Sequence, residues 1–368
     1  MPGMDRKNRL SLEIFSGSQG IAEVHDRWIA LANRCGASQL MQLPDYYTCY
    51  AESLASSITD ILVAAFSRGP ELVAVMPLSY HETRKAGLTV RQLEFPSTPI
   101  PLRDFVAADD VTLDALIRCL RDQFQTAYGK EWDRLRCDGI ARPPETTLFS
   151  NAAEDLVSTS LIGKNNYIQL TAGDYIVDSL SGNMRSNLRR RKKKLAKLGE
   201  FEFKTVAAFP DLENAYEDFV ETEAAGWKSV SGGKRAIKLH PDQKSFYFDL
   251  LERFARRGQA HIHLLELDGR AIASDYCLLA GKSAFSLKHG FDETYSDVTP
   301  SNLLREYTIE YYSANENIEI IDLISGYSWQ DRWKPAHRTV RSFSAFNSTL
   351  TGRLLEAYQG FLSRRRVR

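Results

Sequence analysis

The chain has 368 residues, of which 43% are hydrophobic and 26% are charged, an ordinary composition for a globular protein with enough apolar material for a sizeable core. Lysine plus arginine and aspartate plus glutamate both number 47, so the formal net charge is zero. This balance excludes a generally basic nucleic-acid-binding protein, and the length favours two domains over one.

The cysteines and the N-terminal sequence bear on the cellular compartment. Five cysteines lie far apart, without a CxxC pair, so they offer neither a zinc knuckle nor a redox motif. Isolated thiols are typical of a reducing cytoplasm. The N-terminal sequence lacks the apolar core of a signal peptide, and no apolar run approaches the ~20 residues that a membrane span needs. We therefore expect a cytoplasmic protein without a transmembrane segment.

The first half of the chain predicts a hairpin, a helix and a strand. Residues 60–67 and 71–80 have the composition of two strands, joined by a turn at Arg68–Pro70. A helix is expected over about Thr112–Tyr128, because its leucines and isoleucine recur on one face. Residues 132–139 read as the following strand.

The second half repeats this order. Residues 260–267 and 271–280 predict a second hairpin, whose turn sequence DGR carries a glycine two hundred positions after that of the first hairpin. A third strand at 283–291, a helix at about Ser301–Ser313 and a strand at 317–325 follow. The parallel order predicts two related α/β halves.

A strongly basic segment separates the two halves. Eight lysine or arginine residues fall between Arg185 and Lys197 without an acidic residue, while Met184, Leu188, Leu195 and Leu198 fall along one helical stripe. The segment therefore predicts a helix whose charged surface is a solvated face, a nucleic-acid contact or part of a substrate site. Two more helices are expected at about Leu212–Ala225 and Asp242–Arg257.

The usual catalytic motifs are absent from the sequence. His261 and His263 share one face of a strand, but no further ligand stands at a spacing typical of a metal site, so no metal is expected. Serine-hydrolase, P-loop and dinucleotide-binding motifs are missing. A helix that begins near Ser301, after Pro300, offers unpaired backbone N–H groups that can bind a phosphate.

Four segments carry a family resemblance: residues 183–199, Glu223–Lys228, Leu287–Leu304 and Ile321–Lys334. In order and spacing they resemble the GNAT-related acyltransferases often called the CelD/BcsL or BioF2-like acetyltransferase group, which is related to the FemAB peptidyltransferases. The resemblance is strong from Asn165 to Lys334 and weaker in the first half.

The resemblance implies an α/β (α+β) fold of tandem GNAT-like domains, each a mixed, mostly antiparallel sheet flanked by helices. Residues 1–160 would form a degenerate N-terminal GNAT-like domain and residues 161–350 the acyltransferase domain. Residues 351–368 would form a basic C-terminal helix or tail.

The activity that the resemblance implies is acyl-CoA-dependent N-acylation with acetyl-CoA as co-substrate and no metal. The acceptor would be an amine or hydroxyl of a sugar, an amino acid or a cell-envelope or exopolysaccharide precursor. Two alternatives remain open. One is a FemAB-like transferase that uses aminoacyl-tRNA bound by the basic helix. The other is a catalytically degenerate GNAT-fold scaffold in polysaccharide synthesis. DNA binding is not expected.

The resemblance and the chemistry together predict the site residues. The catalytic candidates are Asp275, Glu223, His289 and Tyr327. Asp275 interrupts an apolar strand, and a carboxylate there is costly unless it is paired or faces a cleft. The coenzyme-binding candidates are Lys288, Thr299, Pro300, Ser301, Asn302 and Leu303, and the acceptor-binding candidates are Trp227, Lys228, Arg185, Arg189 and Trp329.

Two departures from the family pattern support the scaffold alternative. Ser301 stands where relatives tend to carry glycine, and Trp329-Gln330 stands where they tend to carry Tyr-Lys. Tyr327 would then have to replace the missing tyrosine as general acid.

Overall fold

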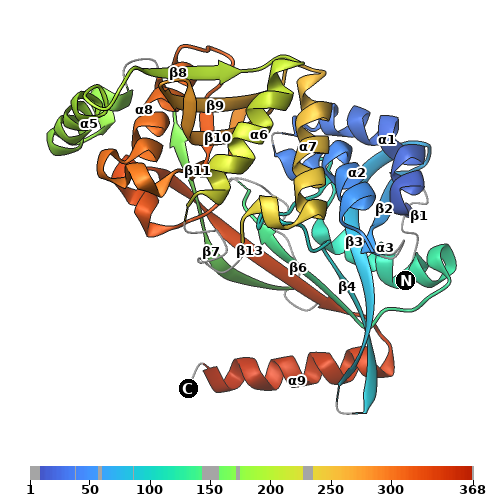
Figure 1. Ribbon diagram of the computed structural model, residues 1–368. Coiled ribbons are helices and arrows are strands. Elements are labelled where there is room, and N and C mark those ends of the chain that lie inside the picture. Colours follow the sequence, from blue (N-terminus) through green and yellow to red (C-terminus); the bar gives the residue numbers. More distant parts are fainter. Residues whose placement is uncertain are drawn as a thin grey trace. The chain divides into compact units, whose positions relative to one another are not determined.

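The computed structural model describes residues 9–37, 39–56, 60–85, 87–142, 157–170, 175–226 and 235–366 (Figure 1). The chain divides into two compact units. The first comprises the chain up to Ala37, Met41–Gly163 and the chain from Arg338 onward, and the second is essentially Lys164–His337. The domain boundaries expected from the sequence stay a prediction.

The first unit contains a mixed sheet. Its elements are β1 (Leu10–Ser16), α1 (Gly17–Arg34), α2 (Pro44–Ser53), β2 (Leu62–Arg68), β3 (Glu71–Lys85), β4 (Leu88–Glu94), β5 (Val106–Ala107), α3 (Leu113–Tyr128), β6 (Arg134–Ile140), β13 (Ala336–Phe346) and α9 (Leu350–Arg366). The strands lie in the order β1-β2-β3-β4-β6-β13, and β5 pairs with β3. Only the β4–β6 pair of this order is parallel.

The second unit contains the C-terminal half of β7 (Ser158–Gln169). It continues with α4 (Tyr175–Ser179), α5 (Gly182–Leu195), β8 (Phe201–Val206), α6 (Asp211–Ala224), η5 (Ile237–Leu239), α7 (Pro241–Ala255), β9 (Ala260–Leu267), β10 (Arg270–Ala280), β11 (Ser283–Phe291), η6 (Glu293–Val298), α8 (Pro300–Ser313), β12 (Ile320–Asp322) and η7 (Ser328–Trp333). The strands lie in the order β8-β9-β10-β11-β12-β7. Here the parallel pair is β11–β12.

The two units repeat the same order of elements. Each has a strand, two helices, three antiparallel strands, a helix, and a strand that pairs in parallel with the third of the three. In each unit a strand from elsewhere in the chain completes the sheet: β13 in the first and β7 in the second. The predicted fold class, tandem mixed and mostly antiparallel sheets flanked by helices, is confirmed. The first strand and the helices α1 and α2 were not among the elements predicted from the sequence.

Local sequence signals explain where several helices begin and end. In α3 the Thr112 hydroxyl accepts a hydrogen bond from the Ala115 N–H (3.2 Å), and Gly129 ends the helix in the left-handed conformation at φ 78°. In α5 the Ser181 hydroxyl accepts from the Met184 N–H in the same way (3.2 Å). The helix expected at about Thr112–Tyr128 from its apolar periodicity is thus confirmed to within one residue.

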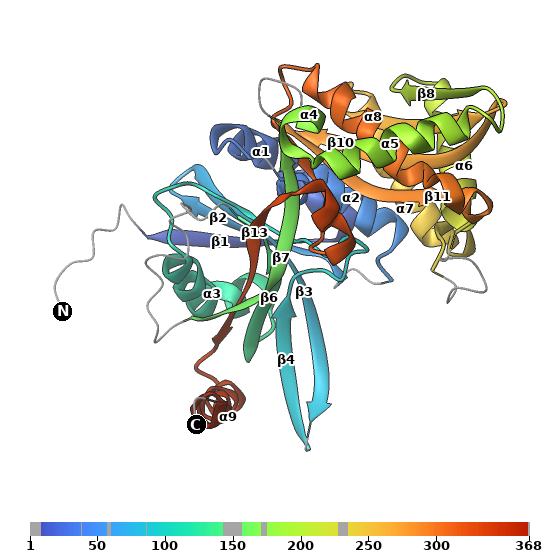
Figure 2. The ribbon, with the colours of Figure 1, turned by 90° about the vertical axis from the view of Figure 1, so that its left-hand side faces the viewer.

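Helices cover both faces of the sheet in the second unit. Figures 1 and 2 show α6 and α7 on one face of β9–β11, with α8 on the other. Tyr276 on β10 donates to the Tyr247 carbonyl of α7 (2.8 Å). None of the helices in the described part of the chain is long and apolar enough to cross a membrane.

A buried polar chain links α8 to β9 and β8. The Tyr312 hydroxyl lies 2.9 Å from His261 Nδ1 and 3.1 Å from His263 Nε2, and His263 Nδ1 lies 2.8 Å from the Thr205 hydroxyl. Burial lowers the pKa of His261 to about 4 and that of His263 well below its usual value. Both imidazoles are therefore neutral at pH 7 and act as hydrogen-bond partners.

These depressed pKa values predict that acid destabilises the protein. The unfolded histidines titrate near 6.5, so their contribution to stability is complete above that pH and is lost as the pH falls towards the folded-state pKa of His261, about 4. Each histidine should reduce the free energy of unfolding by up to about 1.4 kcal/mol per pH unit in this window. Urea unfolding between about pH 7 and pH 5 measures the slope.

His261→Gln should make the slope shallower, whereas the same change at the more exposed His25 should leave it unaltered. Equal slopes in wild type and His261→Gln would contradict the assignment.

Candidate active site

The strand β11 contains one residue more than β10 over the stretch where the two strands pair. Tyr276 pairs with Lys288 and Cys277 pairs with Ser286, so Leu287 is the extra residue of a β-bulge. A bulge interrupts the regular alternation of side chains, and bulges are over-represented next to active sites. The residues on either side of Leu287 therefore reach opposite faces of the sheet.

β11 also parts from β12. The two strands pair in parallel at only three positions, Ser283–Phe285 against Ile320–Asp322. β11 continues to Phe291 while it still pairs with β10. Over Ser286–Phe291, no described strand pairs with the edge of β11 that faced β12. This stretch of β11 is therefore an edge among the described strands.

On the α8 face, the residue before the bulge joins a buried ion pair. Ser286 Oγ donates to Asp275 Oδ1 (2.7 Å) and accepts from Arg305 Nη2 (2.8 Å). Arg305 Nη1 lies 3.0 Å from Asp275 Oδ2, at an angle too oblique for a hydrogen bond, so this contact is an ion pair. Burial raises the pKa of Asp275, and the Arg305 charge opposes this shift. Asp275 therefore serves as the counter-charge of a buried arginine.

On the α6 and α7 face, the residue after the bulge meets a second carboxylate. Lys288 Nζ lies 3.9 Å from Glu223 Oε1 and 5.2 Å from the centre of the Tyr247 ring. Glu223 Oε2 accepts a hydrogen bond from the Ile237 N–H (2.9 Å). The Glu223 side chain is fully buried, whereas that of Lys288 is 19% exposed. This pair combines a carboxylate held in place with an ammonium group that partly reaches solvent.

Gly290 makes this arrangement possible. A Cβ atom at Gly290 would overlap the backbone of Glu223, so β11 and α6 approach too closely for any side chain there. Gly290 thus sets the distance between the strand that carries Lys288 and the helix that carries Glu223.

The remaining predicted catalytic residues lie near the loop after β12. The rings of His289 and Trp329 meet edge to face, with centroids 5.1 Å apart. Trp329 is 39% exposed and Tyr327 65% exposed. Both belong to the segment that begins η7, and Arg332 Nε donates to the Trp329 carbonyl (2.9 Å).

The N-terminus of α8 is the predicted phosphate site. Thr299 adopts the left-handed conformation at φ 46° and Pro300 is the first helical residue. The N–H groups of Asn302 and Leu303 are directed to the Thr299 carbonyl, with N···O distances of 2.9 and 3.4 Å. The helix therefore begins one residue earlier than Ser301.

The basic helix α5 packs against this end of α8. Leu188 and Leu195 are buried, and the stripe between them is filled by Arg191 and Lys192. Arg191 Nη1 contacts the Thr299 hydroxyl, and Lys192 pairs with Glu306 of α8 (2.9 Å). Burial lowers the pKa of Arg191, and repulsion from Arg190 and Arg332 lowers it further. The Arg191 guanidinium thus lies at the N-terminus of α8.

Arg191 and Arg332 were not among the residues predicted from the sequence. The predicted residues of α5 were Arg185, which is half-buried, and Arg189, which is exposed. A signal for Arg191 was present, since the apolar stripe of α5 skips from Leu188 to Leu195 and leaves a charged residue on the packed face.

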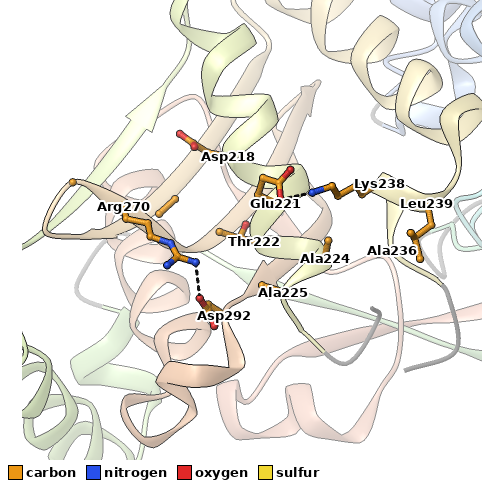
Figure 3. Close-up of a pocket in the computed structure, with 12 residues that line it drawn as sticks. Asp218, Glu221, Thr222, Ala224, Ala225, Ala236, Lys238, Leu239, Arg270 and Asp292 are labelled. Carbon is orange, nitrogen blue, oxygen red and sulfur yellow. Dashed lines mark hydrogen bonds and ion pairs between the residues drawn. The ribbon is translucent and has the colours of Figure 1, made fainter. Parts of the chain in front are cut away.

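An open pocket of about 660 Å³ lies beside the C-terminal half of α6 (Figure 3). It is lined by Asp218, Glu221, Thr222, Ala224, Ala225, Ala236, Lys238, Leu239, Gly269, Arg270, Ala271 and Asp292. Two ion pairs stand in its wall, Glu221 with Lys238 (2.7 Å) and Arg270 with Asp292 (3.2 Å). Burial and, secondarily, the Glu266 charge raise the pKa of Asp218, while Lys204 opposes them. The pocket combines charges of both signs with small apolar side chains.

The structure thus brings the predicted residues together in three groups. Glu223 lies with Lys288, His289 lies with Trp329, and the segment Thr299–Leu303 lies with Arg191. Lys288 lies beside Glu223, on the α6 and α7 face of the sheet, and Asp275 is held beneath α8. Trp227 and Lys228 lie outside the described residues.

The second unit matches a known family of domains. Residues 182–335 fit the model of the acetyltransferase (GNAT) domain family. The segment runs from the start of α5 to the residues after η7, so the three groups described above lie within the part of the chain that is similar to a GNAT domain. A comparison with curated proteins gave no match.

Solved structures share the fold of the whole chain. A structure of FemX is 11% identical, covers 90% of this chain and 98% of its own, and superposes with a TM-score of 0.64. The C-terminal domain of a putative lysylphosphatidylglycerol synthetase from Agrobacterium fabrum is 14% identical, with coverages of 91% and 95% and a TM-score of 0.52. L-PGS from Bacillus licheniformis is 12% identical, with coverages of 88% and 93% and a TM-score of 0.52. At these identities the likeness establishes the fold alone.

The close approach at Gly290 gives a test of the site's construction. Gly290→Ala should destabilise the protein by about 1–3 kcal/mol, because the new methyl group must push β11 from α6. The matched control is Gly163→Ala, since nothing lies within 4 Å of a Cβ there. Chemical denaturation of both variants measures the difference, and equal stabilities would rule out the packing described here.

Proposed function

We propose that the protein is an acyl-CoA-dependent acyltransferase of the CelD/BcsL type that acylates an amine or a hydroxyl of a small polar acceptor. Acetyl is the acyl group that we propose to be transferred. A sugar, an amino acid or a cell-envelope precursor is the proposed acceptor class. Two features of one region carry the proposal: β11 parts from β12, and Arg191 of α5 lies at the N-terminus of α8. Both features fall within the residues that match the GNAT domain model.

The residues at the N-terminus of α8 fit the pyrophosphate of coenzyme A. Pro300 has no N–H, and the Asn302 and Leu303 N–H groups point to the Thr299 carbonyl, so in this first turn the Ser301 N–H and the positive end of the helix dipole would face the anion. Arg191 contacts Thr299 there, and burial and, secondarily, repulsion from Arg190 and Arg332 lower the pKa of Arg191. An anion that carries two negative charges would relieve this repulsion. The segment Thr299–Leu303 and Arg191 would therefore hold the pyrophosphate.

Acyl-CoA would supply an activated carbonyl in the form of a thioester. The edge of β11 beyond Phe285 would align this group and donate main-chain N–H bonds to its oxygen.

Glu223 and Lys288 are the proposed proton-transfer pair. They form a close, oppositely charged couple, and Lys288 partly reaches solvent. A general base must accept the proton of the attacking amine, and the Glu223 carboxylate is the proposed acceptor of that proton. Asp275 is the weaker candidate, because Arg305 and Ser286 already occupy its oxygens. His289 and Tyr327 remain candidates for protonating the leaving thiolate.

The pocket beside α6 is the proposed acceptor site. Its volume falls within the range of about 300–1,000 Å³ that small-molecule sites occupy. Thr222 lines the pocket and precedes Glu223 on the same helix. Exposed ion pairs such as Glu221 with Lys238 are worth little, so a polar ligand can replace one partner at small cost.

Binding of coenzyme A tests the anion site. Arg191→Ala should weaken affinity about tenfold or more, because it removes a charge-assisted contact to phosphate. Lys193→Ala removes a charge from the exposed face of the same helix and should change affinity little. Titration calorimetry measures both affinities. An equal loss of affinity in the two variants would mean that α5 acts only through its overall positive charge and not through a contact of Arg191.

Two carboxamide variants separate the carboxylates. Glu223→Gln can still accept from the Ile237 N–H, so it should fold normally and lose roughly 100- to 10,000-fold in turnover. Asp275→Asn should instead lose about 3–5 kcal/mol of stability, because it leaves Arg305 buried without its counter-charge.

Release of the coenzyme A thiol with a panel of amines measures turnover, and thermal unfolding measures stability. A fully active Glu223→Gln would remove Glu223 from the mechanism. If the protein bound no acyl-CoA at all, this result would support the alternative of a catalytically degenerate scaffold. Salt-sensitive binding of aminoacyl-tRNA would favour the FemAB-like alternative.

A further inference from the structure

The helix α9 presents an apolar face to solvent. Leu350, Leu354, Tyr358 and Phe361 are 78%, 51%, 61% and 52% exposed, and their spacing of four, four and three residues places them on one side of the helix. Among residues 350–361, only Gly352 is buried. Figure 1 shows α9 as a straight helix that follows β13, and Figure 2 views it almost along its axis. A contiguous apolar face of this kind marks an interaction site.

The charge of α9 is strongly positive. The helix carries Arg353, Arg364, Arg365 and Arg366 against the single acid Glu356, although the chain as a whole has no net charge. Three of the arginines follow one another directly at its C-terminal end. An apolar face with aromatic and leucine residues, followed in the sequence by consecutive arginines, is typical of a helix that lies in the plane of a membrane interface.

We propose that α9 docks the protein on an anionic lipid surface. Leu350, Leu354, Tyr358 and Phe361 would enter the boundary between head groups and acyl chains, while the arginines would contact anionic head groups. The inference does not depend on the acyltransferase activity.

A second copy of the chain fits this face less well. A helix of 17 residues is roughly 25 Å long and about 10 Å across, so its one face offers on the order of 250 Å². Stable dimers bury about 800 Å² per partner. A lipid surface does not require a complementary protein surface, and its anionic head groups would attract the positively charged arginines.

Flotation of the full-length protein with lipid vesicles tests the proposal. The protein should bind vesicles of phosphatidylcholine mixed with phosphatidylglycerol, bind far less to phosphatidylcholine alone, and be released by salt. Replacement of Arg364, Arg365 and Arg366 by glutamine should weaken binding about a hundredfold.

A matched pair of variants separates the apolar face from charge alone. Leu354→Asp should weaken binding about tenfold or more, whereas Gly360→Asp, which adds the same charge at an exposed position off the apolar face, should have a much smaller effect. Circular dichroism checks that both variants fold.

Three results would overturn the inference. They are the absence of binding to the anionic vesicles, an equal loss in the two aspartate variants, and a concentration-dependent dimer in lipid-free solution that Leu354→Asp abolishes. The last result would assign the face to a second copy.

Discussion

One extra residue in β11 determines what lies on each face of the sheet at the candidate site. Because Leu287 interrupts the pairing with β10, Ser286 reaches Arg305 and Asp275 under α8, while Lys288 reaches Glu223 on α6. Without the bulge, the two side chains would lie on the same face. The hydrogen bonds of Ser286 to the buried ion pair and the contact of Lys288 with Glu223 are therefore two consequences of one irregularity. Beyond Phe285, the edge of β11 that faced β12 pairs with no strand in the described part of the chain.

The basic helix α5 contacts α8 through only a few of its charged side chains. Most of its lysines and arginines are exposed, but Arg191 and Lys192 interrupt the apolar stripe and contact α8. Placing a guanidinium next to other positive charges at a helix N-terminus is unfavourable unless an anion joins them. The same helix thus contacts α8 through Arg191 and Lys192 and contributes Arg191 to the proposed anion site.

The sequence predicted the secondary-structure elements more accurately than the contacts between residues of different elements. The two hairpins, α3, α5 and α8 follow from periodicity and capping residues, and these are local signals. The bulge at Leu287 depends on the register between two strands, which no local signal sets. For the same reason Asp275 was predicted as catalytic without knowledge of Arg305, which lies thirty positions away on another element. The anion-site residue Arg191 was hidden among seven similar charges, and only its place in the apolar stripe distinguished it.

A crystal structure of the protein with bound coenzyme A would test the account most directly. The account predicts the pyrophosphate at the first turn of α8, in contact with Arg191, and the pantetheine arm along the edge of β11 beyond Phe285. Coenzyme A bound elsewhere would contradict the account. So would a pyrophosphate that contacts neither Arg191 nor Thr299 and leaves the present contact between these two residues unchanged.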